Sequence, residues 1–271
     1  MKDCFGKKYD ALKDKKLWLF DMDGTVYLGN TIFDGTLSLL DKITENGGKY
    51  VFITNNSSKG VDDYVKKVTS MGIKADRKNF YTSVDASAAV LKERFNDSLI
   101  YAQGTYSFIE NLKDEGLNIT TEYDENAECV IVAFDTELTE KKLSNTCKML
   151  LKDVPYYATN PDWVCPTEFG YIPDCGSMCF GIEKATGKAP VFIGKPSPLM
   201  IEEVIKIFNV DKKDVVVIGD RIYTDIKSGV NAGIDTVLVL SGETTLKDCK
   251  KSKIKPTFTI NSVKEIGDLF N

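Results

Sequence analysis

Near its amino terminus the chain reads LWLFDMDGT, residues 17–25. An apolar run is followed at once by two carboxylates, Asp21 and Asp23, and then by a glycine. Such a run is typical of a strand that is covered on both faces of a sheet. Residues two apart in an extended chain project to the same side, so both carboxylates can face one pocket. The stretch therefore predicts a buried strand whose end carries acidic chemistry.

Three later apolar runs, at 50–53, 191–193 and 215–218, are also followed by polar residues. The residues that follow them are Thr54 and Asn55, Lys195, and Asp220, with Asp225 about one helical turn further on. Polar residues gathered where parallel strands end mark the usual active-site edge of such a sheet. We therefore expect these side chains to meet at one edge.

The order of elements predicts the fold class. Strand-like and helix-like segments alternate from residue 16 to about residue 80, and again after about residue 180. This alternation indicates parallel pairing. The roughly 100 residues between have their own αβ rhythm and are numerous enough for a small domain. We predict an α/β protein with a Rossmann-like, doubly wound parallel sheet core at 1–81 and 181–271, and an inserted α/β cap domain at 82–180. A single continuous domain is the alternative.

Composition limits the partners of the chain. Its 271 residues are 42% hydrophobic, with 35 Lys and Arg against 40 Asp and Glu and a formal charge of −5. This near balance produces no long-range field that favours nucleic acid or an anionic membrane. No segment has the length of a membrane span or the apolar stretch of a secretory signal. We expect a cytoplasmic protein without nucleic acid or membrane partners, and a homo-oligomer stays open.

The chain has seven cysteines and no histidine. The cysteines are scattered without a Cys-x-x-Cys pair, which predicts reduced structural thiols. Because the commonest general base is absent, proton transfer near neutral pH must use a carboxylate, Lys, Tyr, Cys or metal-bound water. At Asp21 and Asp23, one carboxylate can attack while the other moves protons.

The acidic residues together predict a magnesium site. Asp21, Asp220 and Asp225 supply the hard oxygen ligands that Mg²⁺ prefers. For Asp225 alone, a charge that complements a helix macrodipole explains the residue equally well.

Thr54, Asn55 and Lys195 are candidates for phosphate binding. Thr54 and Asn55 offer a hydroxyl, an amide and backbone N–H groups just before a helix, which suits a phosphate oxygen. The ammonium of Lys195 could lie near the same anion. Ordinary helix capping and a surface lysine are the structural alternatives.

The ordered set of motifs is more specific than any member. The series Asp-x-Asp-Gly-Thr, Thr-Asn, Lys-Pro and Gly-Asp-x-x-x-x-Asp resembles the haloacid dehalogenase-like hydrolase superfamily. Longer stretches are similar to its NagD-like subfamily: DMDGTVYLG at 21–29, TNNSS at 54–58, YIP at 171–173 followed by CG at 175–176, and GKPSP at 194–198. The resemblance covers nearly the whole chain. Tyr223 departs from it, because many relatives have an acidic or other polar residue there.

This resemblance implies a Mg²⁺-dependent phosphatase that acts on small phosphomonoesters of the sugar phosphate or nucleotide class. It makes Asp21 the nucleophile that forms an aspartyl phosphate, and Asp23 the group that protonates the leaving alcohol and then activates water. The implied metal ligands are Asp21, the backbone carbonyl of Asp23, Asp220 and Asp225, the last directly or through water. The implied phosphate-binding residues are Thr54, Asn55 and Lys195.

Two other functions stay open at this point. A phosphotransferase or mutase could use the same aspartyl phosphate and would differ only in the group that accepts the phosphoryl. A non-catalytic phosphate-binding regulatory protein could keep the same fold, although intact Asp21 and Asp23 argue against it. A dehalogenase fits less well, since its reaction has no leaving alcohol for Asp23 to protonate.

Overall fold

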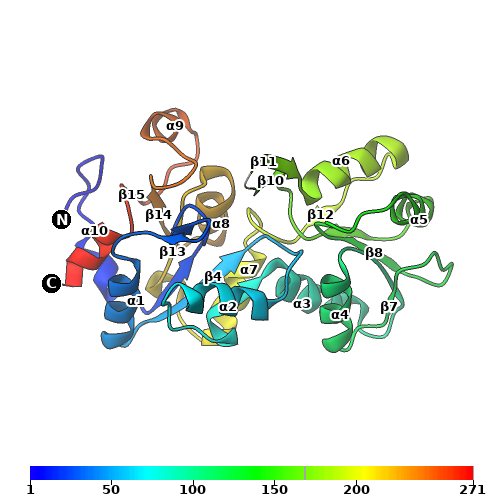
Figure 1. Ribbon diagram of the computed structural model, residues 1–271, viewed down its shortest axis with the longest axis horizontal. Coiled ribbons are helices and arrows are strands. Elements are labelled where there is room, and N and C mark those ends of the chain that lie inside the picture. Colours follow the sequence, from blue (N-terminus) through cyan, green and yellow to red (C-terminus); the bar gives the residue numbers. More distant parts are fainter. Residues whose placement is uncertain (168, 271) are drawn as a thin grey trace. The chain divides into compact units, whose positions relative to one another are not determined.

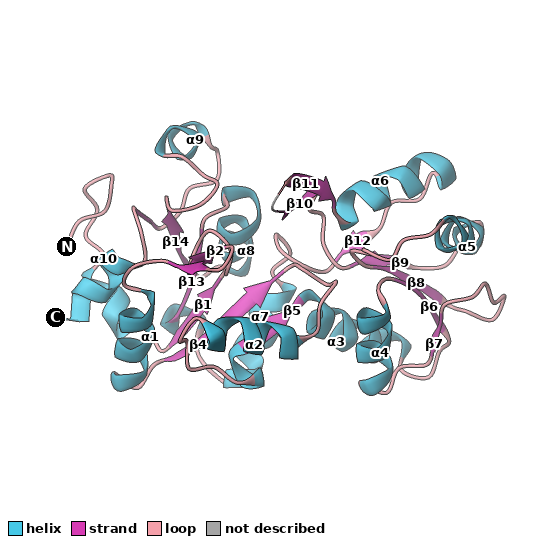
Figure 2. Cartoon of the chain, viewed as in Figure 1, coloured by secondary structure: helices cyan, strands magenta, loops and turns pink. Residues whose placement is uncertain are grey.

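The computed structural model describes residues 1–167 and 169–270. Contacts divide the chain into two compact units. The first unit comprises Met1–Thr54, Val61–Tyr81 and Lys195–Asn271, and the second comprises Asn55–Gly60 and Thr82–Gly194. Figure 1 labels their helices and strands along the chain, and Figure 2 separates the helices from the strands by colour.

The first unit is built on a six-stranded sheet in the order β15-β14-β13-β1-β4-β5. Its strands are β1 Leu17–Phe20, β4 Lys49–Thr54, β5 Phe80–Thr82, β13 Val215–Gly219, β14 Asp235–Val239 and β15 Phe258–Ile260, with a small hairpin of β2 Tyr27–Leu28 and β3 Thr31–Ile32. Its helices are α1 Thr36–Glu45, α2 Val61–Ser70, α7 Leu199–Phe208, α8 Lys227–Ala232, α9 Leu246–Lys251 and α10 Lys264–Gly267. Strand β1 pairs in parallel with both β4 and β13, so their carboxyl ends share one edge.

Helices cover both faces of this sheet. Trp18 and Phe20 of β1 belong to a buried cluster with residues of α1, α2 and α10. On the other face, α8 packs so closely on Val217 that a Cβ at Gly229 would lie 2.4 Å from its side chain, and α7 packs on α8. The strands are therefore apolar on both sides, as the sequence predicted.

The second unit contains a five-stranded sheet in the order β12-β9-β8-β6-β7 and a separate hairpin of β10 and β11. Its strands are β6 Ile100–Gln103, β7 Ile119–Thr120, β8 Cys129–Val132, β9 Tyr156–Ala158, β10 Val164–Thr167, β11 Gly170–Pro173 and β12 Val191–Phe192. Its helices are α3 Ser83–Phe95, α4 Tyr106–Asp114, α5 Glu140–Leu150 and α6 Cys175–Thr186. The recorded pairs of the five-stranded sheet are parallel. The predicted α/β class, with a doubly wound core and an inserted α/β segment, is confirmed.

The unit boundaries differ from the expected ones. A boundary at 180/181 would cut α6, which packs on α5 of the second unit. The units instead divide between Gly194 and Lys195, and residues 55–60 group with the second unit. The short strand β12 pairs with β9, and Val191 is 59% exposed, so the prediction of a buried core strand at 191–193 is wrong. A run of three apolar residues does not by itself indicate which of the two sheets it joins.

Within the described residues, no helix is both long and apolar enough to cross a membrane.

Candidate active site

The carboxyl edge of the six-stranded sheet brings three carboxylates together. Asp21 follows β1, Asp220 follows β13, and Asp225 lies in the π-helical turn Ile222–Ile226 that begins next. One oxygen from each can be chosen so that all lie within 4.8 Å of one another. Asp220 and Asp225 are almost fully buried. The arrangement follows from parallel pairing, because adjacent parallel strands deliver their next residues to the same edge.

Lys195 lies among these carboxylates. Its Nζ is 2.5 Å from Asp21 Oδ1 and 2.7 Å from Asp225 Oδ1, and it donates to the Ile53 carbonyl at 3.1 Å. The side chain is 3% exposed. The last bond is made to the strand that ends at Thr54, so the lysine links β1, β4 and the turn after β13. Charge-assisted hydrogen bonds of this kind fix geometry in a buried site.

The electrostatics follow from this crowding. Burial and the charge of Asp225 raise the pKa of Asp21. Burial and the same neighbour raise the pKa of Asp220 to about 6. Burial opposes the charge of Lys195, but Asp21 and Asp225 outweigh it and raise the pKa of the ammonium. Lys195 pairs with two of the three carboxylates, and the nearby Arg221 pairs with a further carboxylate, Glu243. The site therefore has an excess of negative charge that a cation would relieve.

The residues present fit a divalent cation. Asp220 Oδ2 accepts a hydrogen bond from the Glu243 N–H at 2.7 Å. Asp220 Oδ1 is buried, and the described residues offer it no hydrogen-bond partner. A buried carboxylate oxygen without a donor is costly, whereas it is a favourable ligand for Mg²⁺. Both oxygens of Asp225 already accept hydrogen bonds, from Lys195 and from the Arg221 N–H at 3.1 Å.

Glycines leave the space that these carboxylates occupy. A Cβ at Gly242 would lie 2.0 Å from Asp220 Oδ2, and one at Gly24 would lie 2.5 Å from the same atom. A Cβ at Gly219 would lie 2.3 Å from the Asp225 Cβ. Any larger residue at these positions must displace a carboxylate. Gly24 also has a φ of +85°, which L side chains rarely adopt.

Asp23 lies apart from the buried cluster. Its side chain is 52% exposed, and Lys67 Nζ lies 3.9 Å from its Oδ2. The same Nζ lies 4.1 Å from the centre of the Tyr27 ring. Partial burial raises the pKa of Asp23, while the charge of Lys67 opposes the rise. A raised pKa and partial exposure suit a carboxyl group that exchanges protons with substrate and water.

Thr54 and Asn55 stand on either side of a unit boundary. Thr54 ends β4 and is buried in the first unit. The Asn55 side chain belongs to the second unit, where its Nδ2 donates to Asp162 Oδ2 at 2.8 Å. The same oxygen accepts from Asn160 Nδ2 at 3.0 Å. Thr159, Asn160 and Asp162 are all buried, and they therefore belong to a buried polar network of the second unit.

Sequence reasoning missed the loop after β14. Its Ser241 Oγ donates to the Gly24 carbonyl at 2.7 Å, and its Thr244 N–H donates to the Asp220 carbonyl at 3.2 Å. In the same loop, Glu243 pairs with Arg221 at 2.9 Å. The contacts of this loop with Asp220 come from the Glu243 and Thr244 N–H groups and from Gly242, which leave no pattern of residue types to detect.

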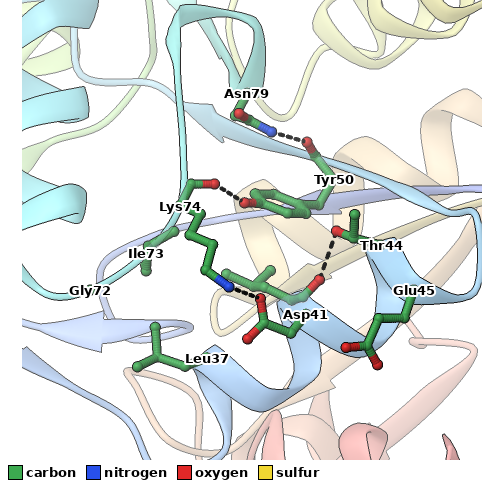
Figure 3. A pocket seen from close by; sticks show the side chains of 10 residues that line it. Leu37, Asp41, Thr44, Glu45, Tyr50, Gly72, Ile73, Lys74 and Asn79 are labelled. Atoms are coloured by element: carbon green, nitrogen blue, oxygen red, sulfur yellow. Dashed lines mark hydrogen bonds and ion pairs between the residues drawn. The ribbon is translucent and has the colours of Figure 1, made fainter.

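The first unit also has a surface pocket of about 460 Å³ (Figure 3). It lies beside Tyr50 near the start of β4, at the opposite end of the strand from Thr54. Its polar side chains are largely paired: Lys74 lies 3.0 Å from Asp41, and Asn79 donates to the Tyr50 carbonyl at 3.1 Å. This pocket therefore shares no residue with the carboxylate cluster.

Two protein families match parts of the chain. Residues 18–118 match a haloacid dehalogenase-like hydrolase family, and residues 192–266 match a HAD-hydrolase-like family. The first match contains Asp21 and Asp23, and the second contains Lys195, Asp220 and Asp225.

Individual proteins resemble the chain over nearly its whole length. An acid sugar phosphatase of Staphylococcus haemolyticus is 33% identical over 252 residues, which are 93% of this chain and 95% of that protein. The crystal structure of a 4-nitrophenylphosphatase from Thermotoga maritima has a TM-score of 0.91 at 37% identity, covering 97% of this chain and all of that one. A structure described as a putative nagD protein has a TM-score of 0.83 at 38% identity and covers 90% of this chain and 95% of its own.

Proposed function

Because this chain belongs to the NagD-like branch of the haloacid dehalogenase-like hydrolases and is a phosphatase, we propose that it hydrolyses small phosphomonoesters, chiefly sugar phosphates. The proposed reaction passes through a phosphorylated Asp21 and uses Mg²⁺ as cofactor. One observation carries the proposal. A single buried ammonium, Lys195, contacts two of three clustered carboxylates, and an oxygen of the third lacks a hydrogen-bond donor among the described residues. Phosphoryl transfer mainly requires such alignment and charge neutralisation.

In the first half-reaction, a carboxylate oxygen of Asp21 attacks phosphorus and the bond from phosphorus to the ester oxygen breaks. Asp23 gives its proton to the leaving alcohol. In the second half, Asp23 takes a proton from water, the water oxygen attacks phosphorus, and the bond to Asp21 breaks. Inorganic phosphate and free Asp21 result. The raised pKa of Asp23 supports its holding a proton at the start of the cycle.

The other residues hold the reacting groups. Asp21, the Asp23 carbonyl and Asp220 would bind the cation, while Asp225 supports it directly or through water and holds Lys195. The cation would offset the charge of the phosphate and of the nearby carboxylates. Lys195 would neutralise phosphate oxygens once substrate is bound, together with Thr54 and Asn55.

The substrate class comes from the relatives. The Staphylococcus protein is named an acid sugar phosphatase, and the Thermotoga protein a 4-nitrophenylphosphatase. A chromogenic aryl phosphate reports on the phosphoryl chemistry, whereas sugar phosphates and nucleoside monophosphates test the class of substrate.

The test combines turnover with detection of the intermediate. The purified chain, treated with EDTA and then supplied with Mg²⁺, should release inorganic phosphate from p-nitrophenyl phosphate and from sugar phosphates. Acid-quenched protein should carry phosphate on Asp21 by mass spectrometry. Transfer to an added sugar hydroxyl without release of inorganic phosphate would indicate a phosphotransferase instead. Binding of phosphate without turnover on any ester would contradict an enzymatic role.

A further inference from the structure

The loop 241–244 after β14 holds one member of the carboxylate cluster on several sides. The Glu243 N–H donates to Asp220 Oδ2 at 2.7 Å, and the Thr244 N–H donates to the Asp220 carbonyl at 3.2 Å. The backbone at Gly242 approaches so closely that a Cβ there would lie 2.0 Å from Oδ2. The carboxylate is therefore fixed through one of its two oxygens.

The same loop is tied to the first acidic motif. Ser241 Oγ donates to the Gly24 carbonyl at 2.7 Å, and a Cβ at Gly24 would lie 2.5 Å from Asp220 Oδ2. Asp220 Oδ2 is thus enclosed by two glycines and one N–H group, while Oδ1 keeps no hydrogen-bond partner among the described residues. The carboxylate has little room to rotate and present both oxygens to one ion.

We propose that the loop 241–244 positions Asp220 so that only Oδ1 binds the cation, and that this restriction favours Mg²⁺ over Ca²⁺. Mg²⁺ requires compact octahedral coordination and few protein ligands, whereas Ca²⁺ takes more oxygens and accepts carboxylates through both. Groups that orient a metal ligand usually change metal affinity about 10- to 100-fold when they are altered. The inference rests on the proposed function for the identity of the site, and its residues are positioning residues that act through Asp220.

Gly242→Ala is the main test variant. Gly242 does not have a positive φ, so its substitution adds a contact with Asp220 without forcing an unfavourable backbone conformation. We expect the affinity for Mg²⁺, measured by titration calorimetry on the metal-free protein, to fall at least about tenfold. The affinity for Ca²⁺ should fall less, so the ratio of the two constants should decrease.

Gly267→Ala is the matched control in the same unit. A Cβ there would meet Leu39 at an ordinary 3.8 Å, and we expect unchanged affinity for both ions. Ser241→Ala removes one hydrogen bond to Gly24 and should weaken Mg²⁺ binding by only about tenfold or less. If Gly242→Ala binds Mg²⁺ like the wild type, or loses both ions by the same factor, the proposal is overturned.

A second measurement is independent of metal and turnover. Asp220→Gly removes every atom of the Asp220 side chain that a new Cβ at Gly242 would strike, including the Asp220 Cβ at 2.6 Å, so adding Gly242→Ala to it should not lower the melting temperature further. In the wild-type background, Gly242→Ala alone should lower it. An equal decrease in both backgrounds would show that the loop does not act through Asp220. None of these variants changes Asp21, so loss of this proposal leaves the proposed phosphatase mechanism testable through Asp21→Asn.

Discussion

The two parallel sheets of this chain both carry acidic residues at their carboxyl edges, but the negative charge is paired with lysine to a different extent in each. In the second unit, Asp135 follows β8 and is fully buried, and Lys142 Nζ lies 2.9 and 3.1 Å from its two oxygens. In the first unit, three carboxylates cluster, and the buried Lys195 pairs with only two of them, Asp21 and Asp225. Polar residues at a sheet edge are therefore a weak indicator of function. An excess of buried charge over its partners is the stronger one.

Asp21→Asn and Asp135→Asn should separate the two edges most clearly. The first change removes the proposed nucleophile and a metal ligand together, and should lower kcat on p-nitrophenyl phosphate by about four orders of magnitude or more. The second disrupts a balanced ion pair and should leave kcat nearly unchanged while lowering the free energy of unfolding by about 1–3 kcal/mol. Near-native turnover in Asp21→Asn, with Mg²⁺ present, would falsify covalent catalysis by this residue.

Asp220→Asn should have opposite effects on metal binding and on stability. It should abolish Mg²⁺ binding, yet stabilise the metal-free protein at pH 7 by about 1–3 kcal/mol. The reason is that the pKa of Asp220 is raised to about 6 in the folded protein. This carboxyl group therefore favours folding at low pH, and that contribution is lost as the pH rises through 6. Urea unfolding of both proteins in EDTA provides the measurement. A less stable Asp220→Asn protein at pH 7 would contradict the excess of negative charge.

The affinity for Mg²⁺ should depend on pH through the same group. Protons compete with the cation for Asp220, whose pKa is raised to about 6 by burial and by Asp225. Affinity should be nearly constant above neutrality and should fall by up to about tenfold for each pH unit below 6. Calorimetric titrations at several pH values test this. An affinity that does not change between pH 7 and pH 5 would exclude Asp220 as a ligand with this pKa.

Gln103→Leu, at the edge of the second sheet, should have the smallest effect. Gln103 is buried at the end of β6, where its Oε1 accepts from Thr146 Oγ1 at 2.5 Å. Its Nε2 has no partner among the described residues, and the Thr146 hydroxyl keeps a bond to the Lys142 carbonyl at 3.0 Å. The free energy of unfolding should therefore change by less than about 1 kcal/mol, and kcat should not change. A large loss of activity would mean that this edge also has a functional part.

The sequence predicted the cluster better than its surroundings. Asp21 and Asp220 directly follow neighbouring parallel strands, and Asp225 lies in the turn that comes next, so all three reach the same edge of the sheet. Lys195 also reaches the cluster, although the strand before it joins the other sheet. The prediction that 191–193 is a buried strand of the core sheet was wrong, because a run of only three apolar residues is compatible with the edge of one sheet as well as with the centre of another.

Two other features left little trace in the sequence. Helix α3 is buried on several sides, so its polar and apolar residues do not alternate with the period of an exposed helix. The loop 241–244 contacts Asp220 through the N–H groups of Glu243 and Thr244 and through the absence of a side chain at Gly242. Only the folded chain reveals such contacts, because residue type does not encode them.

The chain passes between its two units four times, since residues 55–60 belong with the second unit although residues 61–81 belong with the first. Within the segment 55–60, Ser57 Oγ lies 3.0 Å from Thr159 Oγ1 and accepts a hydrogen bond from the Phe134 N–H at 3.0 Å. A chimera that takes only residues 82–194 from a relative would keep the segment 55–60 of this chain but replace Phe134 and Thr159, which Ser57 contacts. Successful module exchange in this family should therefore require two grafted pieces, one long and one very short.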